Sequence, residues 1–258
     1  MPMLAVKFNI GNIVFPIFVQ PKLDGIRCIS TNGYKLSRKN RDILTVNHID
    51  LSELPNDIML DGELYVHGKS FQENTKLIKK YRRDETEEVS YNVYDLPSHT
   101  GNFEERYKEL IKIINKYTLP NVDIVPTYLV HNEHELMEYH KQFIRKGYEG
   151  TIIRTNDTKY EFNKRSKSLL KLKDFIDKTY KIVDIVPSEK LPDQGIVKCT
   201  LTNGRTFTCG MKIDHKERRY MLFNKYEYIG KIAEVRFFEY TDDGIPRHPV
   251  FHGIRLDK

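Results

Sequence analysis

A single lysine separates an apolar run from an Asp-Gly pair in the segment Gln20-Pro21-Lys22-Leu23-Asp24-Gly25-Ile26-Arg27. The run before it, Ile17 to Val19, is β-prone, so we expect a buried strand that ends at Lys22. Asp-Gly between two β-prone runs is a strong signal for a tight turn. A nucleophilic lysine requires this placement, because the strand fixes the amine and the glycine lets a ligand approach the backbone. By itself the segment fits an exposed hairpin with ordinary charges equally well.

The sequence around this segment predicts a mixed α+β unit. Residues 17–22, 25–31 and 34–36 are expected to be strands separated by Asp-Gly and Asn-Gly turns, as the beginning of an antiparallel sheet. A further apolar run covers 58–66. Later strands are expected at 89–95, 150–154 and 168–173. Apolar residues at helical spacing, with a closing Gly147 in the last case, predict helices at 71–81, 103–117 and 133–146.

The pattern changes after Asp174 to short β-prone runs interrupted by one helical stretch near 215–225. The runs cover 179–187, 195–201, 205–210, 230–240 and 250–255. Five short strands with one intervening helix are typical of a small barrel such as the OB-fold. The sequence therefore predicts two domains, residues 1–175 and residues 176–258.

Composition excludes several classes of protein. In 258 residues, 39% are hydrophobic and 30% are charged, which is usual for a globular protein in water. No apolar run approaches 18 residues and the first residues lack the pattern of a signal peptide, so neither a membrane nor secretion is expected. Cys28, Cys199 and Cys209 are widely spaced, which favours a reducing, cytoplasmic location over disulfides or zinc. The net charge of +6 modestly favours a polyanionic partner.

Charged residues inside apolar strands identify the candidate site, because charge there is costly without a partner. They are Lys22, Asp24, Glu63, Asp95, Glu149, Lys171 and Lys173. The last two are two residues apart on one strand, so both amines should emerge on the same face of the sheet. Two lysines on one face repel each other unless an anion lies between them. This face is therefore a candidate phosphate site.

Seven short motifs in order give the chain a resemblance to the covalent nucleotidyltransferases, and specifically to the small ATP-dependent DNA ligases of viruses and phages. Residues 22–27 match the K-x-D-G-x-R motif of that family. The other matches are Ser37-Arg38, Asp61-Gly62-Glu63, Tyr94-Asp95, Glu149-Gly150, Lys171-Leu172-Lys173 and the C-terminal stretch 246–258. The resemblance runs from end to end of the chain. It implies an adenylation domain with antiparallel sheets and flanking helices, followed by an OB-fold barrel.

The resemblance also implies a reaction. Lys22 would attack the α-phosphorus of ATP, form a lysyl-AMP and release pyrophosphate. AMP would then pass to the 5′-phosphate of a nick, and the 3′-hydroxyl would displace it. Fewer than about one in a thousand ordinary lysines is neutral at pH 7, so the site must lower the pKa of Lys22. Lys171, Lys173 and a bound Mg²⁺ would do so by repulsion of like charge.

The family motifs assign roles to individual residues. Catalytic roles would fall to Lys22, Asp24 and Lys173. Gln20 would accept a hydrogen bond from the adenine amino group, Tyr94 would stack on the purine and Glu63 would hold the ribose. The remaining nucleotide-binding residues would be Arg27, Lys171, Lys173, Arg255, Asp257 and Lys258, of which the last three would orient the pyrophosphate. Asp24 and Glu149 would hold Mg²⁺, or Mn²⁺ in its place.

The expected partner is nicked duplex DNA, bound by a monomer through Arg27, Arg38 and Arg165. Arginine suits a 5′-phosphate because its planar fork donates two hydrogen bonds at once. Compared with larger ligases of this family, we expect no N-terminal DNA-binding domain before Met3-Leu4-Ala5, and the segment from Pro187 to Gly204 is too short for an encircling insertion. The basic segments 76–83 and 164–167, or an accessory protein, are candidates to hold the chain on DNA.

Three alternatives remain open at this stage. An mRNA-capping guanylyltransferase shares the lysine motif, although Glu149 and residues 246–251 favour a ligase. An RNA ligase would usually lack the barrel and Arg27. A non-catalytic nucleic-acid-binding module is the alternative of a different class, and the intact set of charged motif residues argues against it.

Overall fold

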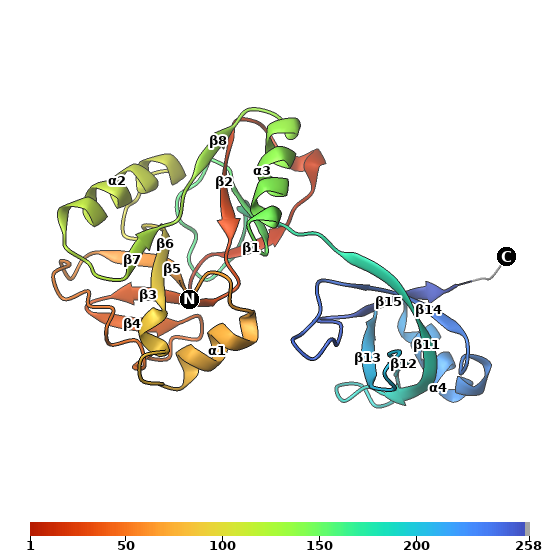
Figure 1. Cartoon of the computed structure of the whole chain (residues 1–258). Helices are drawn as coiled ribbons and strands as arrows, with labels where there is room; N and C mark the ends of the chain where they lie inside the picture. The colour runs from red at the N-terminus through yellow and green to blue at the C-terminus, as the bar shows by residue number, and fades with distance from the viewer. Residues whose placement is uncertain (256–258) are drawn as a thin grey trace. The chain divides into compact units, whose positions relative to one another are not determined.

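The computed structural model describes residues 1–255 and divides the chain into two compact units, Met1–Lys173 and Asp174–Lys258 (Figure 1). The division falls two residues before the expected one. Each unit has its own hydrophobic core. Among residues 1–255 no helix is long and apolar enough to cross a lipid bilayer.

The first sheet of unit 1 holds the lysine segment. Its strands lie in the order β1 (Leu4–Lys7), β10 (Arg165–Leu172), β9 (Gly150–Arg154), β2 (Ile17–Lys22) and β8 (Tyr128–Val130). All neighbours are antiparallel except β1 and β10. Helix α3 (Glu133–Arg145) packs Leu136 and Phe143 against Ile17, Val19 and Ile153 of this sheet. The sequence-distant β2 and β10 thereby flank the same central strand, β9.

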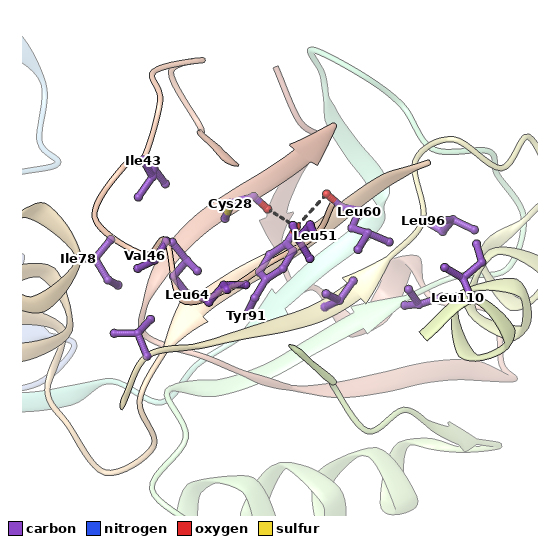
Figure 2. Close-up of a cluster of buried hydrophobic side chains, with 14 of the residues drawn as sticks. Cys28, Ile43, Val46, Leu51, Leu60, Leu64, Ile78, Tyr91, Leu96 and Leu110 are labelled. Carbon is purple, nitrogen blue, oxygen red and sulfur yellow. Dashed lines mark hydrogen bonds between the residues drawn. The ribbon is translucent and has the colours of Figure 1, made fainter. Parts of the chain in front are cut away.

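The second sheet of unit 1 is ordered β4 (Tyr34–Ser37), β3 (Ile26–Thr31), β5 (Met59–Tyr65), β6 (Ser90–Asp95) and β7 (Val122–Ile124). Only β6 and β7 run parallel. Tyr91 lies at the centre of its core, and its buried hydroxyl is 3.0 Å from the carbonyl oxygen of Cys28 and 2.9 Å from that of Leu60 (Figure 2). One side chain of β6 thus ties β3 to β5.

The expectation that residues 17–31 form one antiparallel hairpin is wrong. β2 belongs to the first sheet and β3 to the second, so residues 23–25 pass between sheets instead of turning back. Gly25 permits the crossing, because a Cβ atom there would lie 2.2 Å from the carbonyl oxygen of Leu64. The predicted Asn-Gly hairpin between β3 and β4 is confirmed, and Asn32 and Gly33 both have positive φ (49° and 76°).

The predicted helices of unit 1 are confirmed within two residues at each end. They are α1 (Phe71–Lys79), α2 (Phe103–Lys116) and α3. Ser70 and Asn102 each cap a helix in a reciprocal capping box with the glutamate three residues later. Gly147, with φ of 82°, follows the end of α3 as expected. The caps at Ser70 and Asn102 therefore lie directly before the helix starts that the apolar spacing predicted.

Unit 2 is a closed five-stranded barrel in the order β11 (Ile176–Pro187), β12 (Gly195–Thr200), β13 (Thr206–Met211), β15 (Val250–Ile254) and β14 (Ile232–Phe237). Closure leaves none of these strands as a free edge. Helix α4 (His215–Phe223) lies between β13 and β14 in sequence, and Asp214 caps it. The five strands and the helix expected after residue 175 are all present.

Replacement of Gly25 tests the crossing between the two sheets. We expect Gly25→Ala to lower the free energy of unfolding by about 1–3 kcal/mol, because the new methyl group meets backbone atoms of β5. Gly11→Ala is the matched control, since its nearest neighbour, Asn9 Oδ1, would be at an ordinary 3.7 Å. Urea denaturation measures both. Equal stability of the two variants would contradict this account of the crossing.

Candidate active site

A cavity of about 710 Å³ lies in unit 1 beside the end of β2. Its lining includes nine cationic residues: Lys22, Arg27, Arg38, Lys39, Arg41, Lys79, Arg154, Arg165 and Lys171. Among residues 1–255, the only carboxylate in the lining is Glu63. Such an excess of positive charge in a concave, partly desolvated space attracts anions strongly. The cavity suits a ligand with several phosphate groups.

Lys22 belongs to a three-residue charge cluster that is centred on the carboxylate of Glu149. Its ammonium pairs with Oε2 of Glu149, and the ammonium of Lys173 pairs with Oε1 of the same carboxylate. The Glu149 side chain is only 4% exposed, so its charge requires these partners. The backbone N–H of Glu149 also donates to the carbonyl oxygen of Lys22 at 3.0 Å. The two lysines predicted from separate motifs therefore meet on one carboxylate.

Gly150 brings the three strands close enough for this cluster to form. It pairs with Lys22 across β2 and β9 and has a φ of 150°, where a side chain is strained. A Cβ atom at this position would lie 2.3 Å from the carbonyl oxygen of Leu172. Lys173 follows Leu172 directly, so the absence of a side chain at residue 150 lets its amine reach Glu149. This contact gives the Glu-Gly motif a physical reason.

Lys171 lies on β10 and lines the cavity, while Lys173 follows the end of that strand. Burial lowers the pKa of Lys171 below its ordinary value, and the positive charges of Lys22, Arg165 and Arg38 lower it further. Lys22 and Lys171 therefore lie close enough to repel each other. Arg38 and Arg165 are exposed at the cavity, and Arg165 donates to the carbonyl oxygen of Ala5 at 3.1 Å.

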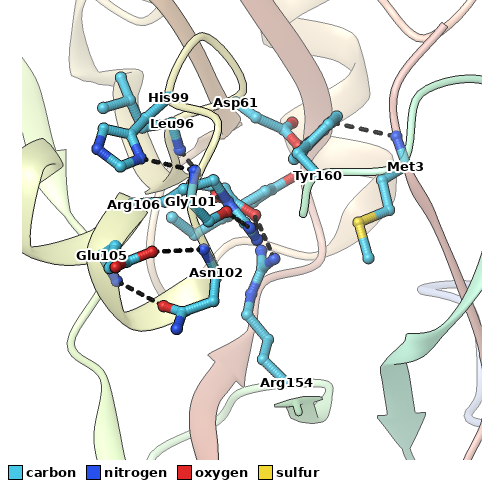
Figure 3. A network of polar contacts seen from close by, with 12 residues as sticks. Met3, Asp61, Leu96, His99, Gly101, Asn102, Glu105, Arg106, Arg154 and Tyr160 are labelled. Carbon is cyan, nitrogen blue, oxygen red and sulfur yellow. Dashed lines mark hydrogen bonds and ion pairs between the residues drawn. The ribbon is translucent and has the colours of Figure 1, made fainter. Parts of the chain in front are cut away.

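Arg27 is fixed by a buried carboxylate that the sequence-based assignment omitted. Its Nε and Nη2 donate to the two carboxylate oxygens of Asp61 at 2.9 and 2.5 Å. Tyr160 donates to Asp61 at 2.7 Å and accepts from the backbone N–H of Met3 at 3.1 Å (Figure 3). Burial alone would lower the pKa of Arg27, but Asp61, Tyr94 and Tyr160 together raise it well above its ordinary value. Asp61 precedes Gly62-Glu63 in a recognised motif, and that position could have identified it.

Tyr94 and Glu63 line the cavity together. The Tyr94 hydroxyl donates to Oε2 of Glu63 at 3.4 Å, and the guanidinium groups of Arg27 and Arg154 lie 5.8 and 5.5 Å from the centre of its ring. Burial raises the pKa of Glu63 to about 7, although Lys22 and Arg27 oppose the shift. A flat ring and a carboxyl group at one end of a cationic cavity suit a planar base and a hydroxylated sugar.

Gln20 is 1% exposed and is part of a buried polar chain. Its Oε1 accepts from Nε of Arg154 at 2.8 Å, and Arg154 also pairs with Asp95. Arg106 donates to the same carboxylate, through Nε to Oδ1 at 2.6 Å (Figure 3). Burial would raise the pKa of Asp95, but Arg154 and Arg106 together hold it below its usual value. Arg154 was not predicted, although an arginine ending an apolar strand was the available signal.

The basic segment 76–83 has a mixed role. Lys79 lines the cavity. Arg82 instead donates to the carbonyl oxygens of Lys76 at 2.6 Å and Lys80 at 3.2 Å, which satisfies the end of α1. Only part of this segment is therefore available to a ligand.

The expected metal ligands are Asp24 and Glu149. No group of three or more His, Cys, Asp or Glu side chains that could hold an ion occurs in residues 1–255. Mg²⁺ commonly takes only one or two carboxylates together with substrate phosphates, so two carboxylates beside an anion cavity fit its chemistry. Glu149 already tolerates two positive charges at its oxygens.

The three residues expected to orient the pyrophosphate belong to unit 2. The backbone N–H of Arg255 donates to the carbonyl oxygen of Ile232 at 2.8 Å, and Asp257 and Lys258 lie outside the described residues.

The family model described as ATP dependent DNA ligase domain matches residues 2–173, and the one described as DNA ligase OB-like domain matches residues 194–255. The chain belongs to the ATP-dependent DNA ligase family. The first match covers the whole of the cavity and its charge cluster. The second covers four of the five barrel strands.

Several relatives of this ligase-family chain come from viruses and phages. The DNA ligase of African swine fever virus (isolate Warthog/Namibia/Wart80/1980) is 31% identical over 87% of the chain and 59% of its own length. The DNA ligase of Enterobacteria phage T4 is 26% identical, with 86% and 60% covered. The chain thus spans about 60% of the length of these curated relatives.

Solved structures agree with this family. The Chlorella virus DNA ligase-adenylate is 28% identical, covers 100% of this chain and 98% of its own, and has a TM-score of 0.59. A Lig E DNA ligase has a TM-score of 0.82 with 98% of both chains covered. At 22% identity this second likeness concerns the fold alone.

The raised pKa of Glu63 predicts a pH-dependent stability. Folding favours its protonated form, so the stability present below pH about 4.5 is lost as the pH rises to about 7. Glu63→Gln removes this ionisation. We expect the variant to gain on the order of 3 kcal/mol over the parent above pH 7 and nothing below pH 4. Urea denaturation across pH 4–8 measures the difference, and parallel pH profiles would contradict the assignment.

Proposed function

We propose that the chain is an ATP-dependent DNA ligase that seals nicks in duplex DNA through an AMP bound covalently to Lys22. The observation that carries the proposal is the position of Lys22, which lines a nine-cation cavity and pairs with the nearly buried Glu149. A structural lysine would not require such a concentration of positive charge around it. The two family matches, which cover both units, support the same reaction.

The first step is a displacement at the α-phosphorus of ATP. The neutral Lys22 amine forms the N–P bond, and the P–O bond to pyrophosphate breaks with both electrons leaving on the pyrophosphate. Glu149 stabilises the ammonium form of Lys22, so the amine must lose its proton and this contact before it attacks. Repulsion from Lys171 and the burial of the cluster favour that loss.

The cavity offers a place for each part of the nucleotide. We assign the purine to the ring of Tyr94 and to Gln20, and the ribose to Glu63. Lys171 and Lys173 would take the phosphates, with Asp24 as a further catalytic group. Arg255, Asp257 and Lys258 keep their expected role toward the pyrophosphate. The adenylation domain would extend to residue 175 and the OB domain over 176–258.

Mg²⁺ fits the carboxylates of Glu149 and Asp24. When bound, the ion would neutralise phosphate charge and withdraw electrons from the α-phosphorus. In the structure the carboxylate of Glu149 pairs with Lys22 and Lys173. Binding of Mg²⁺ there would therefore require that the ion replace at least one of these two ammonium groups during the reaction cycle. Glu149 orients the amine of Lys22 through its carboxylate and holds the backbone of Lys22 through its N–H group.

Nick recognition falls to the arginines. Arg38 and Arg165 are exposed beside Lys171 and can grip a 5′-phosphate with two hydrogen bonds each. Arg27 is held by Asp61 and provides a fixed positive charge behind them. After AMP transfer to that phosphate, the 3′-hydroxyl forms the phosphodiester and AMP leaves. Binding by a monomer would follow the shape and charge of the backbone, not its sequence.

Intact mass spectrometry tests the first step. We expect incubation with ATP and Mg²⁺ to add one AMP to the protein, and Lys22→Ala to abolish the addition completely, because no other group supplies the nucleophile. GTP is the parallel incubation. Lys108→Ala, an exposed lysine on α2 paired with Glu104, is the control and should react as the parent does.

The possible results separate the candidate functions. Addition of GMP but not AMP would assign the chain to guanylyl transfer. No adduct from either nucleotide in a folded sample would refute the enzyme and leave a binding module.

Salt dependence tests the role of the exposed arginines. We expect Arg38→Ala and Arg165→Ala each to weaken binding to a nicked duplex and to reduce the slope of log Kd against log salt by about 1, because each loses one phosphate contact. Fluorescence anisotropy over a range of NaCl concentrations measures the slope. Lys108→Ala should leave it unchanged. Slopes equal to that of the parent in both arginine variants would exclude these contacts.

A further inference from the structure

The side-chain amide of Gln20 is held in one orientation. Its Oε1 accepts from Nε of Arg154 at 2.8 Å. Its Nε2 donates to Oγ1 of Thr127 at 2.8 Å and to the carbonyl oxygen of Tyr94 at 3.3 Å. Oγ1 of Thr127 itself donates to the carbonyl oxygen of Val125 at 3.3 Å, so its hydroxyl proton is in use and it must accept from Gln20. Every partner thus has a fixed polarity.

A flip of this amide is costly for the same reason. It would place Nε2 against the donor-only guanidinium of Arg154 and Oε1 against the carbonyl oxygen of Tyr94. Two buried hydrogen bonds would become a donor–donor and an acceptor–acceptor contact in a side chain that is 1% exposed. The network that surrounds Gln20 therefore decides which end of the amide faces each neighbour.

Arg154 cannot easily move, because its guanidinium contacts Gln20, Asp95 and Phe103. It pairs with Asp95, whose second cation is Arg106. Its guanidinium also lies 4.5 Å from the centre of the Phe103 ring at the start of α2. The orientation of Gln20 is thus linked to the buried core of unit 1.

The side chain of Gln20 can therefore only accept a further hydrogen bond. Both N–H groups of Nε2 are engaged, and the remaining capacity is the second lone pair of Oε1. Gln20 and Arg154 both line the cavity. A purine that reaches Gln20 can therefore form a hydrogen bond only by donating, as the 6-amino group of adenine does. The 6-carbonyl group of guanine would meet an acceptor.

We propose that Arg154 and Thr127 are positioning residues that hold Gln20 as an acceptor and so make the cavity select adenine over guanine nucleotides. This inference rests on the proposed function, because selection is exercised when the nucleotide is transferred to Lys22. A glutamine side chain can donate or accept, so Gln20 alone would permit either base. The inference therefore assigns the choice of base to the residues that fix the orientation of Gln20.

Two substitutions of Arg154 test the proposal as a matched pair. Arg154→Lys keeps a cation that can only donate, whereas Arg154→Gln can also accept and so permits the reversed amide. Both shorten the side chain and remove the guanidinium that contacts Gln20 and Asp95 at the same time. We expect the ratio of kcat/KM for ATP to that for GTP, measured by nucleotide transfer to the protein, to fall on the order of tenfold in Arg154→Gln, the value of about one hydrogen bond. Arg154→Lys should retain most of the parent's ratio.

A second pair keeps the test decisive if Arg154→Gln does not fold. Thr127→Val leaves one N–H of Gln20 without its acceptor and should lower the same ratio by a few fold, while Thr127→Ser should not. Thermal denaturation of each variant accompanies the kinetics.

The outcomes separate the inference from the proposed function. If the parent forms no adduct with either nucleotide, the proposed function and this inference both fail. If the parent is adenylated but both pairs show equal ratios within each pair, the inference alone is overturned. A merely structural role would change the rates with ATP and GTP together and leave their ratio unchanged.

Discussion

The nearly buried carboxylate of Glu149 is the constraint around which the site is arranged. A carboxylate that is 4% exposed is costly unless cations accompany it, and Lys22 and Lys173 supply two. Lys22 ends β2 and Lys173 follows β10, and these two strands flank β9 on opposite sides. The need to compensate the charge of Glu149 therefore brings the ends of β2 and β10 together. Gly150 makes the approach sterically possible. Charge compensation and backbone packing thus converge on the residue that we propose as nucleophile.

The cavity beyond this cluster has the opposite imbalance. Nine cations and one carboxylate line it, and they repel one another until an anion enters. The protein limits that repulsion by anchoring some cations in the core, as Asp61 does for Arg27 and Asp95 does for Arg154. Arg38 and Arg165 are left exposed at the cavity. The anchored groups can position a nucleotide, and the exposed ones can meet a second, larger anion.

Local signals predicted much of the fold, and their failures have physical reasons. Helix caps at Ser70 and Asn102 and the closing Gly147 are encoded within a few residues, so the helix ends were accessible. The Asp-Gly signal at residue 24 is also local, but Gly25 is required by close approach to β5, a long-range contact that no local pattern reports. Ile43, Val46 and Ile49 enter the core from an irregular segment without periodicity, and were missed for that reason. In the site, the motifs predicted their individual residues. The hydrogen bonds that connect Gln20, Arg154 and Asp95 depend on tertiary packing, which the sequence does not report.

The central claim is that Lys22, among the lysines gathered here, is the group that becomes covalently modified. Peptide mapping by mass spectrometry after incubation with ATP and Mg²⁺ tests it most directly. Alkaline conditions are used throughout, because they preserve the phosphoramidate bond between lysine and AMP. The account predicts AMP on the peptide that contains Lys22, with Lys171 and Lys173 unmodified. AMP on either of those two lysines, or a nucleotide that is bound without any covalent link, would contradict it.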